Sequence, residues 1–168
     1  MLTKVISGGQ TGADRGGLDA AIALGIEHGG YCTFKRRAED GRVPERYKLT
    51  ELALFGYGHR TLKNVLESDA TVIFVYGVEP AVAPGGPSGS EITRRMAKKY
   101  LKALCVVDLE ALGIDGAADL ITDWLENCEA LGRDIETLNV AGSRESKAPG
   151  IEVAVRTVMT KVLERCRA

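Results

Sequence analysis

The chain has 168 residues, of which 45% are hydrophobic and 27% charged, as in ordinary globular proteins with a sizeable core. Its formal net charge of −1 argues against a general nucleic-acid-binding protein, and its apolar runs are too short to span a bilayer. We therefore expect one domain over residues 1–168 that binds neither nucleic acid nor membranes. The absence of a signal-peptide pattern predicts a cytoplasmic protein. Four widely spaced cysteines without zinc-type spacing predict reduced thiols and no protein-bound metal.

The first half of the chain alternates apolar runs with helical patterns. In chain order we expect a strand at 3–7, a helix at about 14–24, a short strand at 29–32, a long loop at 34–49 and a helix at about 60–68. Asp14 is the candidate N-cap of the first helix, and Gly25 is the candidate residue that stops it.

The second half continues the same alternation. In chain order we expect a strand at 70–77, a helix to about 101, a strand at 103–109, a helix with an apolar stripe from 117 to 128, a strand at 137–142 and a final helix from about 151. The strand at 70–77 is a continuous apolar run, typical of a parallel strand buried on both faces. The pattern predicts a single Rossmann-like, doubly wound α/β domain with a mostly parallel sheet and helices on both faces.

Basic residues are concentrated between Lys35 and Lys63. This segment holds eight basic and four acidic residues, which gives it a net charge of +4. A local positive field in a nearly neutral protein suits a small anionic ligand better than a polymer. A solvated basic loop is the simpler interpretation of the charge alone.

Three glycine-rich or polar loops each follow a predicted strand, and in a parallel sheet these loops share one edge. The first, "SGGQTGAD", precedes a helix, so that Gly8, Gly9 and Gly12 could bring backbone N–H groups close to an anion. Gln10 and Thr11 could add side-chain hydrogen bonds. A turn without a ligand is the alternative to this phosphate-binding loop. The loop matches neither GxGxxG nor GxxxxGK[ST], which disfavours an NAD dehydrogenase and a P-loop NTPase.

The second and third loops add polar groups to the same edge. In "PGGPSGSEIT", Ser88 and Glu91 have the spacing of a capping box, while Gly85, Gly86 and Gly89 indicate close backbone approach. In "AGSRES", Arg144 could clamp a phosphate and Glu145 could bind a heterocycle or a ribose hydroxyl, although an ordinary salt-bridged loop is an equal alternative. Together the loops predict a cleft large enough for a mononucleotide or a pterin phosphate.

Five segments together resemble one family over nearly the whole chain: "SGGQTGADRGGLDAA", "RRAEDGRVPERYKLTE", "RTLKNVLESDATVIF", "GGPSGSEITRR" and "LNVAGSRESKAPGI". This family is known as "putative molybdenum carrier proteins", a circularly permuted, YpsA-like branch of the SLOG superfamily. The resemblance implies a Rossmann-like fold and a nucleotide-type ligand. It also implies a site that contains Gly8, Gly9, Thr11, Gly12, Asp14, Arg36, Arg37, Arg60, Asn64, Gly86, Ser88, Ser90, Thr93 and Arg144.

Two functions remain open at this point. The first is a binding protein for a phosphorylated heterocycle, with the molybdenum cofactor (molybdopterin) as candidate cargo. The alternative is a nucleotide-processing, phosphoribohydrolase-like enzyme that acts on a nucleotide or an NAD-derived ligand. The related phosphoribohydrolase branch has a catalytic Glu in PGGxGTxxE where this chain has Thr93, so Asp14 and Glu145, with Glu39 and Glu91, are the remaining acid–base candidates. Related folds often pair helices between subunits, which predicts a homo-oligomer.

Overall fold

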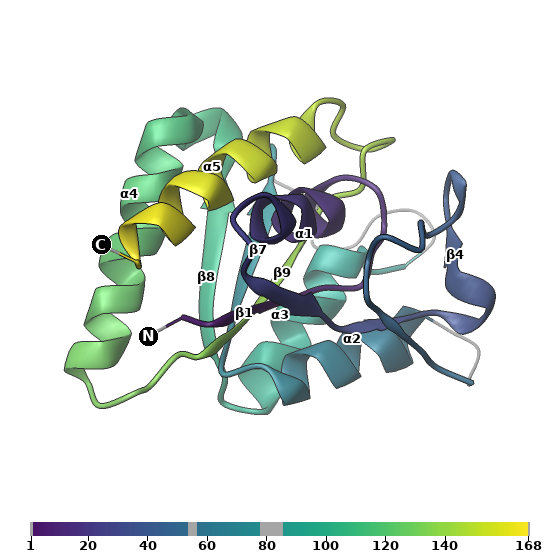
Figure 1. Ribbon diagram of the computed structural model, residues 1–168, viewed down its shortest axis with the longest axis horizontal. Coiled ribbons are helices and arrows are strands. Elements are labelled where there is room, and N and C mark those ends of the chain that lie inside the picture. The colour runs from purple at the N-terminus through teal and green to yellow at the C-terminus, as the bar shows by residue number, and fades with distance from the viewer. Residues whose placement is uncertain (1, 54–56, 78–85, 168) are drawn as a thin grey trace.

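A five-stranded parallel sheet forms the centre of the computed structural model, which describes residues 2–53, 57–77 and 86–167 (Figure 1). In spatial order its strands are β2 (Glu27–Gly29), β1 (Lys4–Ile6), β9 (Thr137–Gly142), β7 (Ala70–Val75) and β8 (Ala103–Asp108). All neighbouring pairs are parallel. The six residues of β7 are all buried, as its uninterrupted apolar sequence predicts.

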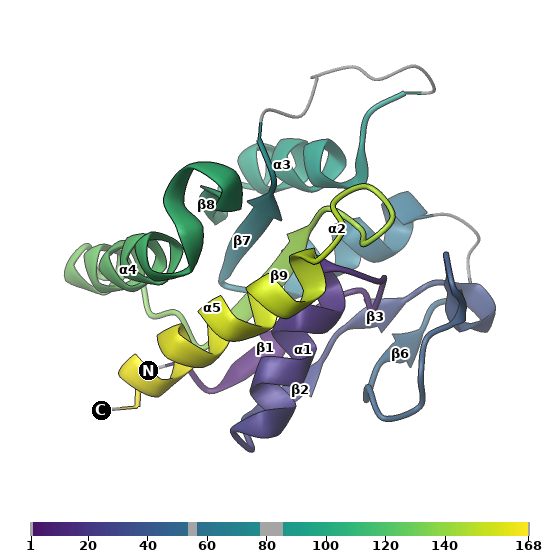
Figure 2. The ribbon, with the colours of Figure 1, turned by 90° about the horizontal axis from the view of Figure 1, so that it is seen from above.

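Helices cover both faces of this sheet, which confirms the predicted doubly wound α/β class. The helices α1 (Ala13–Ala23), α4 (Leu109–Ala130) and α5 (Ile151–Arg165) lie on one face, and α2 (Tyr57–Glu67) and α3 (Gly89–Lys99) lie on the other (Figure 2). The main core fills the space between the sheet and the first group, where Val5, Phe74, Leu138, Val155 and Met159 are fully buried. None of the described helices has the length and apolar character needed to cross a membrane.

Helix α1 begins at Ala13, one residue before the predicted N-cap, so the assignment of Asp14 as N-cap is wrong. Gly12 occupies the N-cap with φ 83, and no side chain caps the helix there. A Cβ atom on Gly12 would lie 2.5 Å from the carbonyl oxygen of Ser143, so the close approach of the loop after β9 requires glycine. The helix stops before Gly25, which has φ 64, as predicted.

The predicted strand at 29–32 is in fact two strands. β2 ends at Gly29, and β3 (Tyr31–Cys32) pairs in parallel with β6 (Thr50–Glu51) in a separate small sheet. Gly30 lies between them with φ 117, where a Cβ atom would overlap the backbone of Ser7. The chain therefore turns away from the central sheet at this glycine.

The segment from 34 to 49 is folded rather than an irregular loop. It contains the turn η1 (Phe34–Arg36) and a hairpin of β4 (Arg37–Ala38) and β5 (Gly41–Arg42). A second, smaller core lies beneath it and consists of Leu18, Cys32, Val43, Tyr47 and Leu49. Leu18 belongs to α1, so this core fixes the basic segment against the helix that follows β1.

Candidate functional site

The connections after β1 and β7 leave the sheet toward opposite faces. β1 leads into α1 on one face and β7 leads toward α3 on the other, while β9 lies between the two strands and ends at Gly142 (Figure 2). In open α/β sheets, ligands bind at the carboxyl ends of the strands, in the crevice where neighbouring connections diverge. The candidate site therefore lies at this edge, beside the loops that the sequence singled out.

A narrow cleft lies in this crevice. Its volume is about 30 Å³, more than the roughly 10–15 Å³ that one water molecule needs but smaller than the predicted mononucleotide-sized cleft. It is lined by Gly8, Asp14, Arg60, Thr61, Asn64, Gly89, Thr93, Asn139, Val140, Ala141 and Gly142. Among these, the sequence predicted Gly8, Asp14, Arg60, Asn64, Gly89 and Thr93 as ligand contacts. The cleft admits one small group, and the body of a larger ligand would lie outside it.

Asp14 and Arg60 form an ion pair at the cleft. Nη1 of Arg60 donates to Oδ2 of Asp14 at 2.8 Å, and the two side chains are only 15% and 5% exposed, respectively. The same carboxylate oxygen accepts the backbone N–H of Gln10 at 3.2 Å. A Cβ atom on Gly8 would overlap the guanidinium group of Arg60. The close approach that the glycines of the first loop indicated is here an approach by the protein's own arginine.

Several backbone N–H groups of the first loop are used within the chain. The N–H of Gln10 donates to Asp14, that of Thr11 to Oε1 of Gln10 at 3.0 Å, and that of Gly12 to Oε2 of Glu152 at 3.0 Å. The N–H groups of Gly8 and Gly9 donate to none of the residues that the structure describes. Of these two residues, Gly8 lines the cleft, so its N–H group is the candidate donor of this loop for a ligand.

The loop after β9 is tied to the start of α5 by Glu145. One carboxylate oxygen accepts the N–H of Gly150 at 2.5 Å, and the other accepts the N–H of Glu152 at 3.0 Å. A carboxylate at the first turn of a helix satisfies its free N–H groups and the positive end of its dipole. Glu145 thus has a structural role that the sequence analysis did not anticipate.

Glu39 joins three segments of the site. Its carboxylate accepts hydrogen bonds from Thr11 Oγ1 and from the N–H and Oγ of Ser146, and Nη1 of Arg144 lies 3.8 Å away. Burial would raise the pKa of Glu39, but the hydrogen bonds from Ser146 and Thr11 and the charge of Arg144 outweigh it, so the pKa lies below its ordinary value. The sequence analysis named Glu39 only as a possible acid, because nothing local shows that three loops meet at it.

The adjacent residues Arg36 and Arg37 have different environments. The guanidinium group of Arg36 is buried and donates to four backbone carbonyls, those of Val43, Pro44, Tyr47 and Leu49, at 2.9–3.2 Å. Lys35 and Arg36 both have left-handed backbone angles, with φ 57 and 53, which is unfavourable for residues with a side chain. Arg37 is exposed, and its guanidinium group contacts none of the described residues as a hydrogen-bond or ion-pair partner. We therefore assign Arg36 to the fold of the segment and retain Arg37 as a candidate ligand contact.

The remaining predicted residues lie on α2 and α3 or beside them. Asn64 holds the backbone of Tyr31, accepting its N–H at 2.8 Å and donating to its carbonyl at 3.0 Å. Ser88 caps α3 by accepting the N–H of Glu91 at 3.1 Å, as the capping pattern predicts. Thr93 donates to the carbonyl of Gly89 at 2.8 Å. Ser90 is buried, Gly86 has φ 103, and Gly85 lies outside the described residues.

Asn139 lines the cleft but was not among the predicted ligand contacts. It is 2% exposed and lies within β9, and its Nδ2 donates to Oγ1 of Thr71 on the neighbouring strand at 3.3 Å. A buried polar residue inside the apolar run "TLNVAG" is the sequence signal that could have identified it.

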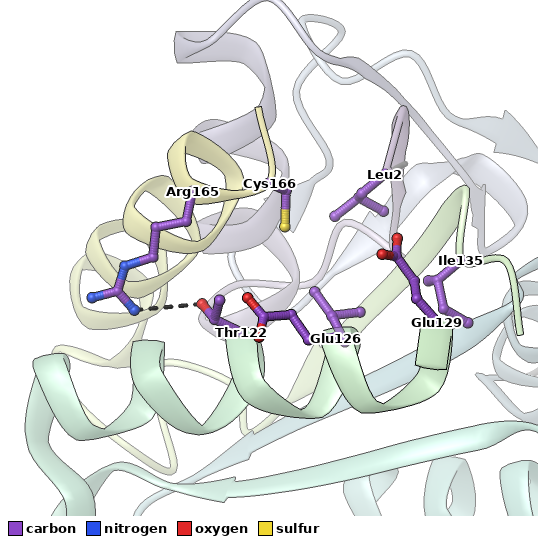
Figure 3. Close-up of a pocket in the computed structure, with 8 residues that line it drawn as sticks. Leu2, Thr122, Glu126, Glu129, Ile135, Arg165 and Cys166 are labelled. Atoms are coloured by element: carbon purple, nitrogen blue, oxygen red, sulfur yellow. Dashed lines mark hydrogen bonds between the residues drawn. The ribbon is translucent and has the colours of Figure 1, made fainter. Parts of the chain in front are cut away.

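A second cavity, of about 220 Å³, lies at the other end of the strands, between α4, α5 and Leu2 (Figure 3). Glu126 and Glu129 of α4 and Cys166 are among its lining residues, and Arg165 donates to Oγ1 of Thr122 at 3.4 Å beside it. We place the candidate site at the carboxyl edge, where the diverging connections lie. Cys166 and the other three cysteines are free thiols, and no three His, Cys, Asp or Glu side chains in the described ranges are grouped to hold a metal.

Comparisons with known proteins agree with the fold and with the predicted resemblance. The model of the "Circularly permutated YpsA SLOG family" matches residues 5–163. A crystal structure of a "Putative molybdenum carrier protein" from Syntrophus aciditrophicus SB shares 41% sequence identity and a TM-score of 0.85, over 96% of this chain and 95% of that one. No curated protein matched the chain.

Proposed function

The chain belongs to the circularly permuted YpsA SLOG family, and on that premise we propose that it binds a small phosphorylated ligand built on a heterocycle. The observation that carries this proposal is the position of the cleft at the divergence of the β1 and β7 connections. Gly8 lines the cleft, and the N–H groups of Gly8 and Gly9 donate to none of the described residues. Such paired donors at the end of a strand suit the oxygen atoms of a ligand.

The cations proposed to hold a phosphate are on two segments that Glu39 joins, the hairpin β4–β5 and the loop after β9. Arg37 is exposed on the hairpin β4–β5, and Arg144 follows β9 with its Nη1 3.8 Å from Glu39, too far for a hydrogen bond. Glu39 connects the hairpin to the loop of Arg144. Arginine forms strong, geometrically defined hydrogen bonds with phosphate, so these two residues are the proposed phosphate contacts.

The first ligand to test is the phosphorylated pterin of the molybdenum cofactor. The reason is the name of the relative from Syntrophus aciditrophicus SB, which describes that protein as a carrier of molybdenum. In a carrier of this kind the pterin cargo brings its metal with it, and the protein needs to recognise the phosphate and the ring. We propose the same role for this chain.

Hydrolysis of a nucleotide is the second candidate function, and one observation favours it. Asp14 is a carboxylate that lines the cleft and could act as a general base. Glu145, the other acid–base candidate, is engaged by the N–H groups at the start of α5. The related phosphoribohydrolase branch has its catalytic Glu at the position of Thr93, whose hydroxyl here donates within α3. A hydrolase would therefore depend on Asp14.

Two measurements distinguish the two functions: the identity of the ligand that copurifies with the protein, and whether the protein hydrolyses added nucleotides. Protein purified without oxygen from a molybdenum-replete host should carry a pterin detectable by mass spectrometry, with molybdenum in proportion to it. It should leave AMP, NAD and ADP-ribose intact over hours. Release of a free base or ribose phosphate that is lost in the Asp14→Asn variant would establish the hydrolase instead. A bound, unchanged nucleotide without molybdenum would retain the binding function with a different cargo.

A further inference from the structure

The charged groups at the cleft do not form an anion site. Among the described residues that line it, Asp14 and Arg60 are the charged ones, and they neutralise each other across 2.8 Å. The candidate phosphate contacts Arg37 and Arg144 do not line it. A phosphate in the cleft would meet the carboxylate of Asp14 as well as the guanidinium group of Arg60, so the pair offers an anion little net attraction. An uncharged group that donates a hydrogen bond to the carboxylate therefore suits the cleft better than an anion.

Asp14 has one carboxylate oxygen without a partner. Oδ2 accepts hydrogen bonds from Arg60 and Gln10, whereas Oδ1 accepts none from the described part of the chain. The residue as a whole is only 3% exposed, but Oδ1 is not among the described side-chain atoms that are both buried and unpartnered, so it remains in contact with the space of the cleft. A carboxylate oxygen without a partner in the chain can accept a hydrogen bond from a donor group of a ligand.

We infer that Oδ1 of Asp14 accepts a hydrogen bond from an amino, imide or hydroxyl group of the ligand. This inference rests on the proposed function and specifies which end of the ligand enters the cleft. The volume of about 30 Å³ has room for such a group, and the proposed phosphate contacts Arg37 and Arg144 lie outside the cleft. Asp14 thus selects ligands that carry a hydrogen-bond donor at a fixed distance from their phosphate.

The test compares the Asp14→Asn variant with wild-type protein by isothermal titration calorimetry. The probes are GMP, 2′,3′-dideoxy-GMP, ribose 5-phosphate, guanosine and inorganic phosphate. GMP presents donors on both base and sugar, dideoxy-GMP on the base, and ribose 5-phosphate on the sugar, while inorganic phosphate lacks both. Asp19→Asn is the matched control, because Asp19 is also on α1 but pairs with Arg46 at 3.0 Å and does not line the cleft.

We expect Asp14→Asn to weaken GMP binding by about 10- to 100-fold, as for the loss of a hydrogen bond to a charged group. Binding of inorganic phosphate should stay equal or become tighter, because a negative charge is removed. Asp19→Asn should change neither. If dideoxy-GMP also loses affinity in Asp14→Asn, the donor is on the base. If ribose 5-phosphate loses affinity instead, the donor is on the sugar.

Equal weakening of GMP and inorganic phosphate would overturn the inference, because Asp14 would then act only by holding Arg60 for an anion. Unchanged affinity for every donor probe would overturn it as well. If guanosine binds as tightly as GMP, the phosphate contributes nothing to binding and that part of the proposed function is wrong. If Asp14→Asn also weakens guanosine binding, the role of Asp14 is retained. A wild-type protein that binds none of the probes overturns both. If Asp14→Asn does not fold, the double variant Asp14→Asn/Arg60→Gln is used in its place, because it leaves no unpaired buried charge.

Discussion

The carboxylate of Glu39 accepts two hydrogen bonds from Ser146, one from the backbone N–H at 3.1 Å and one from Oγ at 2.5 Å. The two residues are 107 positions apart in the chain. Because Thr11 donates to the same carboxylate, the hairpin β4–β5, the loop after β1 and the loop after β9 are held together at one point. The arrangement of the site therefore depends on the ionisation of Glu39.

Stability should depend on pH through Glu39. The pKa of Glu39 in the folded protein lies below the ordinary value of 4.5. Its contribution to stability is therefore complete above pH 4.5, and it is lost as the pH falls through the pKa of the folded state. Glu39→Gln should reduce the free energy of unfolding by about 1–2 kcal/mol at pH 7, and the difference from wild type should shrink toward pH 3. Urea unfolding at both pH values measures it. Glu45→Gln, a change on the same segment at a surface ion pair with Arg42, is the control. A difference that does not depend on pH would contradict this role of the carboxylate.

Gly16 should tolerate no side chain, although it lies inside a helix where alanine is normally favoured. A Cβ atom there would lie 2.6 Å from the carbonyl oxygen of Glu152, in the backbone of α5. We expect Gly16→Ala to destabilise the protein by about 1–3 kcal/mol. Gly116→Ala in α4 is the matched change, since its Cβ would meet side-chain atoms of Leu112 at an ordinary 3.6 Å. It should be neutral or stabilise by up to about 1 kcal/mol. Equal effects of the two changes in urea unfolding would mean that α1 and α5 are not packed this closely.

Substituting the two neighbouring arginines should have opposite consequences. Arg36→Ala removes the donors of four backbone carbonyls and should lower the free energy of unfolding by about 2–3 kcal/mol. It should also open the segment 34–49 to limited proteolysis. Arg37→Ala should change stability by less than about 0.5 kcal/mol, as is usual for exposed residues, while weakening the binding of a phosphorylated ligand such as GMP. A stable Arg36→Ala variant with an intact segment would refute the structural role of Arg36.

A methyl group at Gly8 should disturb the cleft without unfolding the protein. It would displace the guanidinium group of Arg60, which is the mobile end of a long side chain and can move away from Asp14. We expect Gly8→Ala to retain a native circular dichroism spectrum and to bind GMP at least about tenfold more weakly, as for the loss of one hydrogen bond. Gly58→Ala, in α2 near Arg60, adds its Cβ to open space and should leave GMP affinity unchanged. Native GMP affinity in Gly8→Ala would place the ligand elsewhere.

The sequence by itself determined the α/β class and most of the elements. Strand β9 begins and ends where predicted, and the apolar run at 70–77 and the stripe of the last helix locate β7 and α5 to within a few residues. These features are local, because the periodicity of a strand or a helix depends on the order of neighbouring residues. The sequence also selected Gly8, because loops that follow parallel strands converge at one edge, while the family resemblance selected Asp14 and Arg60.

Only the tertiary structure decided how these residues are used. Arg36 looks like a ligand contact in the sequence, and the fold buries it among carbonyls from four other residues of its segment. The glycines that suggested an anion instead accommodate Arg60, the side chains of Leu49 and Val43, and the loop after β9. Glu39 becomes a junction because it meets Thr11 and Ser146, which lie far from it in the chain. The physical reason is the same in each case: partners of buried charges and of close-packed glycines come from distant segments, and no local pattern specifies them.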